Sequence, residues 1–108
     1  MNERFGLKKT TIEKIQSVLT DCPQVEKAVL YGSRAMGNYK YGSDIDLTLL
    51  GGDDLTMKVL HRIMDGLDDL LLPYTIDVSI FRQISDPDLI EHIQSEGVTF
   101  YEKGGTTP

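Results

Sequence analysis

Two acidic residues one position apart are the first candidates for chemistry in this chain of 108 residues. They are Asp44 and Asp46, and a third carboxylate, Asp77, lies in a later apolar run. Side chains alternate between the two faces of a strand, so an extended segment places Asp44 and Asp46 on one face. If the two acidic segments form neighbouring strands, we expect all three carboxylates to meet on one side of a sheet.

Such a grouping of carboxylates is unfavourable without a cation. Two carboxylates about 4 Å apart repel each other by roughly 4 kcal/mol at an effective dielectric constant near 20. Mg²⁺ is a hard cation that takes carboxylate, water and phosphate oxygens together. Two Mg²⁺ ions held by Asp44, Asp46 and Asp77 would suit an in-line phosphoryl displacement. A single Asp-x-Asp pair is more often a solvated strand end, and the later Asp77 is what favours a site for metal and nucleotide.

A glycine–serine turn lies upstream of the acidic residues. Gly32 and Ser33 follow an apolar segment and are predicted to open a helical turn. Glycine lets the backbone approach a ligand closely, and backbone N–H groups at a helix start attract anions. Taken alone, a Gly-Ser pair is more often a plain strand-to-helix turn. Arg34 has two open roles, which are to pair with a phosphate or to brace Asp44 and Asp46.

Hydrophobic spacing predicts the elements that position these residues. Apolar residues at helical spacing, or in short runs bounded by Gly and Pro, predict helices over 10–22, 55–71 and 87–96 and strands over 25–31, 45–50, 75–81 and 98–101. Thr10 or Thr11 is expected to cap the first helix, and Pro23 and Pro73 to end the first two. The alternating order predicts an α/β or α+β fold with a small mixed sheet flanked by helices. We expect one domain over 1–103 and a flexible tail over 104–108.

Charge and composition narrow the function classes. The chain has 17 acidic and 11 basic residues, and its formal net charge is −6. Proteins that bind nucleic acid through its phosphates cluster Lys and Arg, and the longest basic run here is Lys8-Lys9. Direct binding of a long nucleic acid is therefore disfavoured. No apolar run approaches the roughly 20 residues needed to span a bilayer, so no membrane segment is expected.

The single cysteine and the two histidines carry less chemical signal. Cys22 cannot form an internal disulfide, and we expect it to be a small core residue. The first residues lack the apolar centre of a secretory signal, which together with the lone thiol favours a cytoplasmic protein. His61 and His92 lack metal-ligand spacing, so we expect them on helix surfaces and not as catalytic bases or zinc ligands.

The composite motif resembles the nucleotidyltransferase superfamily of the DNA polymerase β type, and specifically its minimal nucleotidyltransferase (MNT) members. That signature is a Gly-Ser pair, a spacer, Asp-x-Asp and a later strand-borne Asp. Here Gly32-Ser33 is followed after ten residues by Asp44-Ile45-Asp46, and then by Asp77. The fuller form Gly-Ser-Arg-Ala-x-Gly…Ser-Asp-Ile-Asp-Leu matches residues 32–37 and 43–47. The x position is frequently Arg in such proteins and is Met36 here, which removes one contact to phosphate or acceptor.

The resemblance implies the nucleotidyltransferase fold and transfer of a nucleoside monophosphate, usually AMP from ATP, to an acceptor with release of pyrophosphate. By position, Asp44 and Asp46 would bind two Mg²⁺ ions. Asp77 would bind the catalytic ion and favour deprotonation of the acceptor hydroxyl. The nucleotide-binding residues would be those of the turn, which are Gly32, Ser33 and Arg34.

The resemblance also implies a partner. Larger transferases of this type use an added helical domain to cover the base and the acceptor, so we expect a second chain or a homodimer to supply that cover. MNT proteins typically pair with a helical HEPN-domain toxin that cleaves RNA, and neutralise it by binding and by transferring AMP to a tyrosine. We therefore expect a Mg²⁺-dependent protein adenylyltransferase that acts as an antitoxin. Two alternatives stay open, a non-catalytic nucleotide-binding subunit that covers its partner and a small-molecule nucleotidyltransferase.

Overall fold

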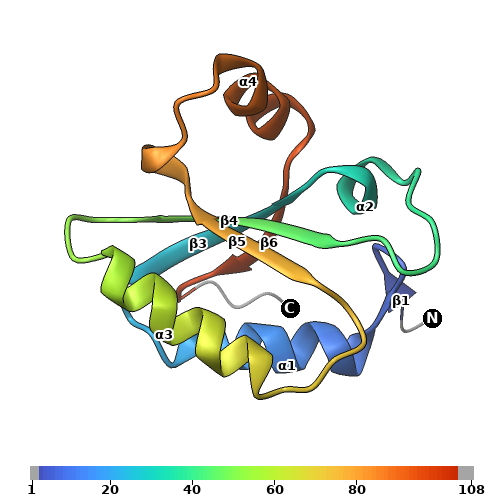
Figure 1. The fold of residues 1–108 in the computed structure, drawn as a ribbon, viewed down its shortest axis with the longest axis horizontal. Coiled ribbons are helices and arrows are strands. Elements are labelled where there is room, and N and C mark those ends of the chain that lie inside the picture. The colour runs from blue at the N-terminus through green and yellow to red at the C-terminus, as the bar shows by residue number, and fades with distance from the viewer. Residues whose placement is uncertain (1–2, 105–108) are drawn as a thin grey trace.

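A mixed four-stranded sheet organises the chain. The computed structural model describes residues 3–104, and Figure 1 shows the sheet between two layers of helix. The strand order is β5-β4-β3-β6, with bounds β3 Val25–Tyr31, β4 Ile45–Gly51, β5 Ile76–Ile80 and β6 Val98–Glu102. β3 pairs antiparallel with β4 and β6, whereas β4 pairs parallel with β5. The α/β fold class with a small mixed sheet is therefore confirmed.

The helices are divided between the two faces of the sheet. Both 12-residue helices, α1 (Lys9–Thr20) and α3 (Met57–Asp68), run across one face, and α4 (Pro87–Glu96) lies on the other (Figure 1). The short α2 (Ser33–Met36) follows β3, and a 3-10 turn, η1 (Phe81–Gln83), follows β5. Two two-residue strands, β1 (Glu3–Arg4) and β2 (Leu7–Lys8), pair before α1 and were not predicted. No helix within residues 3–104 has the length and apolar character to cross a bilayer.

The hydrophobic core fills the layer between the sheet and the α1–α3 pair. The alternate β4 residues Ile45, Leu47 and Leu49 are fully buried and cluster with apolar side chains of both helices. Side chains of a strand alternate between its faces, so the residues between them, including Asp46, face the α4 side. Cys22 belongs to the same core at 3% exposure, which confirms its expected structural place. The buried face thus fixes the register that presents Asp46 on the other face.

The first helix begins and ends earlier than its sequence signals predict. Lys8 is its N-cap residue and makes no side-chain capping bond, so the prediction of a Thr10 or Thr11 cap is wrong. β2 runs directly into α1, so pairing with β1 sets the helix start in place of a capping hydroxyl. The helix ends at Thr20, before the proline at 23.

The second long helix is also shorter than predicted. α3 begins at Met57, with the Thr56 hydroxyl accepting from the Val59 N–H, and ends at Asp68. The leucine spacing continues past the helix because Leu70 and Leu72 pack on the core from the loop before β5. A helical pattern of apolar residues therefore overstates the helix here.

The remaining elements follow the predictions closely. Asp86 caps α4 and Pro87 is its first residue, as expected, and Gly97 is its C-cap. Gly97 is extended and not left-handed, and it is needed for space, because a Cβ there would lie 2.6 Å from Val29 Cγ1. β3 has its predicted bounds, β4 and β6 each extend one residue further, and β5 is one residue shorter at both ends. The predicted tail, apart from Gly104, lies outside the described residues.

Candidate active site

The two strand-borne aspartates lie on adjacent strands in the same register. Parallel pairing of β4 with β5 sets Asp46 beside Asp77, and antiparallel pairing with β3 sets Asp46 beside Tyr31 on the other side. Register partners in adjacent strands point to the same face of a sheet. The predicted geometry, in which neighbouring strands bring these carboxylates to one face, is confirmed for this pair. Asp44 is exposed and lies one residue before β4.

Asp46 lies close to two other carboxylates, those of Asp77 and Asp44. Burial raises the pKa of the Asp46 carboxyl above its ordinary value, and the Asp77 and Asp44 carboxylates raise this pKa further. Burial also raises the pKa of Tyr31, to which the charges of Asp46 and Asp77 add. A cation bound among these groups would relieve their mutual repulsion.

The acidic side chains near Asp46 do not by themselves form a complete set of metal ligands. Across residues 3–104, no three His, Cys, Asp or Glu side chains already form a group that could hold a metal ion. Mg²⁺ is usually held by one or two carboxylates, with water and substrate phosphates as its other ligands. The Asp46–Asp77 pair, with Asp44 close enough to act on Asp46, fits that mode of binding. The donor set therefore fits Mg²⁺ bound together with a nucleotide.

The glycine–serine turn touches the acidic pair. Gly32 has φ 80° and ψ −157° at the N-cap of α2, a conformation that side-chain-bearing residues rarely adopt. A Cβ at Gly32 would lie only 2.5 Å from Asp46 Oδ2. Ser33 is partly exposed, and its carbonyl accepts from the Gly37 and Asn38 N–H groups. The missing side chain at Gly32 is thus what lets the turn and the carboxylate share this space.

Arg34 donates its hydrogen bonds to two backbone carbonyl groups. Its side chain is 3% exposed, and its Nε and Nη2 donate to the Ser43 carbonyl at 3.1 and 2.8 Å. Its Nη1 donates to the Phe5 carbonyl at 2.9 Å. The guanidinium also lies 5.4 Å from the ring centre of Tyr39 and 5.0 Å from that of Tyr74. Arg34 therefore braces the backbone just before Asp44, where a phosphate or carboxylate contact was expected.

His92 is the site residue that sequence reasoning missed. It was expected on a helix surface, whereas its Nε2 accepts a hydrogen bond from the Gly32 N–H at 3.0 Å. Its ring meets the ring of Tyr31 edge-on, with centroids 6.1 Å apart. A signal was present, because Leu89, His92 and Ile93 recur at helical spacing and share one face of α4. His61, by contrast, is exposed on α3 as expected.

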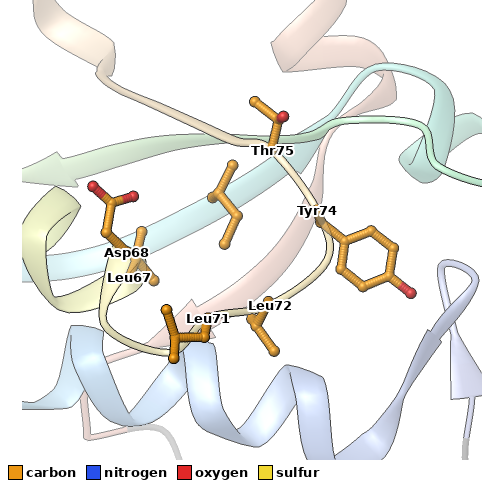
Figure 2. Close-up of a pocket in the computed structure, with 7 residues that line it drawn as sticks. Leu67, Asp68, Leu71, Leu72, Tyr74 and Thr75 are labelled. Carbon is orange, nitrogen blue, oxygen red and sulfur yellow. The ribbon is translucent and has the colours of Figure 1, made fainter.

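One pocket lies away from these residues. It has a volume of about 420 Å³ and is formed by the end of α3 and the loop before β5. Figure 2 shows Leu67, Leu71 and Leu72 among its lining side chains, with Tyr74 and Thr75 on the loop. None of the acidic or turn residues lines it. This pocket is therefore separate from the acidic residues and the glycine–serine turn.

Comparison with known proteins agrees with this geometry. Residues 13–105 match the family model described as polymerase beta, nucleotidyltransferase. The chain belongs to this family. The expectation of a nucleotidyltransferase is thereby confirmed, and the shared motif residues Gly32, Ser33, Asp44 and Asp46 all lie inside the matched region.

A curated relative adds detail. The chain is 28% identical over 86 residues to MJ0141 of Methanocaldococcus jannaschii, which is named as a candidate protein adenylyltransferase. That alignment covers 78% of this chain and 85% of the relative. The similarity thus extends over most of both proteins.

Solved structures share the fold. A chain from a toxin–antitoxin structure with AMP-PNP superposes with a TM-score of 0.69 at 24% identity, over 86% of this chain and 74% of that one. A chain from the tri-AMPylated Shewanella oneidensis HEPN toxin in complex with MNT antitoxin gives 0.65 at 22% identity, over 88% and 72%. A structure described as a minimal nucleotidyltransferase gives 0.65 at 23% identity, over 89% and 95%. These likenesses confirm the nucleotidyltransferase fold.

Proposed function

We propose that this chain is a Mg²⁺-dependent adenylyltransferase that transfers AMP from ATP to a tyrosine of a HEPN-domain partner and so acts as its antitoxin. The observation that carries the proposal is the register pairing of Asp46 with Asp77 beside the Gly32 turn, in a chain of the nucleotidyltransferase family. The naming of MJ0141 supports adenylyl transfer to protein, and the AMP-PNP and AMPylated HEPN structures support the nucleotide and the partner.

The proposed reaction divides its tasks among few residues. Asp44, Asp46 and Asp77 would hold Mg²⁺, which when bound neutralises charge on the triphosphate. The Gly32-Ser33 turn would orient the terminal phosphates. The tyrosine oxygen forms a bond to the α-phosphorus, and the bond from this phosphorus to the bridging oxygen of the β-phosphate breaks. Pyrophosphate leaves with that electron pair, and Asp77 favours loss of the tyrosine proton.

The surroundings of the site leave space for an acceptor protein. Asp44 is exposed, and the loop before it carries Tyr41, which is fully exposed, and Tyr39, which is 39% exposed. Arg34 fixes the end of this loop through the Ser43 carbonyl. We infer that a HEPN partner covers this open side and presents its tyrosine to the carboxylates, whereas a second copy of this chain is the alternative cover.

Mass spectrometry of the partner tests this function. Wild-type protein mixed with its HEPN partner, ATP and Mg²⁺ should add the mass of one or more AMP groups to the partner, and omission of Mg²⁺ should abolish the addition. Asp46→Asn and Asp77→Asn should each lower the rate by about a hundredfold to a thousandfold, because a charge-stabilising group is lost. Asp65→Asn on α3, an exposed residue, is the matched control and should transfer normally.

The acidic variants should remain folded. The carboxyl of Asp46 has a raised pKa in the folded chain, so its ionised form opposes folding above that pKa. Asp46→Asn should therefore keep or raise the thermal midpoint in metal-free buffer at neutral pH. Equal neutralisation of the toxin by wild type and by Asp44→Asn/Asp46→Asn would favour the non-catalytic binder. AMP found on a small molecule but never on the partner would favour the small-molecule transferase.

A further inference from the structure

We propose that His92 is a positioning residue that holds the Gly32 turn against Asp46, and so sets the spacing between the phosphate-side turn and the carboxylates. The inference rests on the proposed function in one respect, which is that the Gly32-Ser33 turn binds the phosphates of the nucleotide. The hydrogen bond from the Gly32 N–H to His92 Nε2 is 3.0 Å long and joins residues 60 positions apart in the sequence. It ties α4 directly to the end of β3.

The geometry of the turn explains why it needs such a tie. Gly32 has a left-handed φ of 80° and is the single residue between β3 and α2, and a glycine backbone has more conformational freedom than that of any other residue. A partly buried backbone N–H also requires an acceptor. His92 supplies one, and because Gly32 lies against Asp46 Oδ2, a shift of this turn would displace the carboxylate or open a gap beside it.

The imidazole ring of His92 contacts Tyr31 as well as the Gly32 N–H. Its ring meets Tyr31, the residue before Gly32 and the register partner of Asp46, in an edge-on contact at 77°. The neighbouring Ile93 is buried at 5% exposure and anchors α4 to the sheet side. To accept from Gly32, Nε2 must be unprotonated, so the ring carries its proton on Nδ1 in this arrangement. His92 therefore acts on the site through the backbone of Gly32.

The alternative is that His92 only helps to pack α4. A packing role would lower stability when the side chain is truncated, but would leave the nucleotide kinetics unchanged once the protein is folded. A positioning role gives a different pattern, in which a substitute that keeps an acceptor at the same place restores function. Gln can place its amide oxygen near the position of Nε2, whereas Ala offers no acceptor.

The test uses the full chain with its HEPN partner, ATP and Mg²⁺. His92→Ala should lower kcat/KM for ATP by about tenfold to a hundredfold, because misplacement of a binding group carries that scale of loss. His92→Gln should recover a large part of it. His61→Ala is the matched control, since His61 is exposed on α3, and it should behave as wild type. In the chain alone, the Gly32 amide should exchange with solvent faster in His92→Ala than in wild type or His92→Gln.

The outcomes separate the two proposals. If wild type transfers AMP and His92→Ala matches it in kcat, KM and Gly32 exchange, the positioning role is overturned while the proposed function stands. If wild type transfers nothing, the function fails, and Gly32 exchange together with calorimetric binding of Mg²⁺ and AMP-PNP decides the role of His92. If His92→Ala does not fold, His92→Gln decides, and a folded Gln variant with Ala-like exchange at Gly32 would contradict the inference.

Discussion

Gly32 combines an unusual backbone conformation with close contact to a candidate active-site carboxylate. Its φ of 80° would be strained for any other residue, and the space for a Cβ is occupied by Asp46 Oδ2. Gly37 offers a comparison within the same motif. It has a similar φ of 85°, but a Cβ there would meet no atom within 4 Å. Gly37 lies in the left-handed helical region with ψ 3°, whereas Gly32 has ψ −157°, so Gly37 gives a reference for a positive φ without a clash with the carboxylate.

We predict that Gly32→Ala abolishes AMP transfer, because the added methyl group would overlap Asp46 Oδ2 and displace this carboxylate from its place beside Asp77. Its free energy of unfolding should fall by about 1–3 kcal/mol from strain, and more if Asp46 cannot move. Gly37→Ala should lose about 1–2 kcal/mol from its left-handed backbone and keep its transfer rate. Urea unfolding and partner AMPylation measure the two quantities. Equal loss of transfer in both variants would show that strain alone is responsible.

At this scale the sequence predicted the acidic residues better than their supports. The shared face of Asp46 and Asp77 follows from strand alternation once β4 and β5 are neighbours, whereas Asp44 lies one residue before β4. The partners of Arg34 and His92 depend on how loops and α4 return to the end of β3. The contacts span 29 and 60 positions, and no local pattern encodes which backbone group each side chain will meet.

Among the elements, the turn after α3 shows where periodicity misleads. The helix ends at Asp68, yet the leucines continue, and Leu70 and Leu72 still pack on the core. Leu71 between them has a left-handed φ of 55° and is 89% exposed. The strands and the start of α4 were predictable because Gly, Pro and Asp mark their ends. The end of α3 was not, because leucines that pack on the core from a loop leave the same sequence pattern as a helix.

We predict that Leu71→Gly raises the free energy of unfolding by up to about 1 kcal/mol. The change removes about 1–2 kcal/mol of left-handed strain, and the greater freedom of glycine in the unfolded chain offsets part of this gain. Leu70→Gly is the contrasting variant and should be destabilised, because Leu70 packs on the core. Urea unfolding of both variants measures these changes in the free energy of unfolding. A destabilised Leu71→Gly would mean that the exposed leucine contributes packing in solution.

For the whole molecule, the sheet separates the hydrophobic core on one face from the candidate active site on the other. The core, including Cys22, lies between the sheet and the α1–α3 pair, and the carboxylates lie on the α4 side. The thiol of Cys22 therefore reports on the opening of the core and not on events at the site. Burial raises the pKa of Cys22, an effect that Asp21 adds to and Arg62 opposes.

We predict that Cys22 reacts slowly with iodoacetamide in the native protein, because burial blocks access and the raised pKa lowers the thiolate fraction at a given pH. The rate should rise with urea in step with the unfolded fraction. A Cys22→Ala/Ser17→Cys variant, with its thiol on an exposed α1 position, should react at once without denaturant. A native Cys22 rate equal to that of the Ser17→Cys thiol would contradict a sealed core.

The parallel pairing of β4 with β5 has one more consequence. The two strands are joined only by the crossover through α3, so Asp46 and Asp77 become neighbours when that crossover docks and separate when it opens. A ligand that bridges them binds the native state alone, and at a hundredfold excess over its Kd it adds about 2.7 kcal/mol to stability by mass action. Bound nucleotide would thus hold the two strands together, and the free energy of unfolding would rise with the logarithm of the nucleotide concentration.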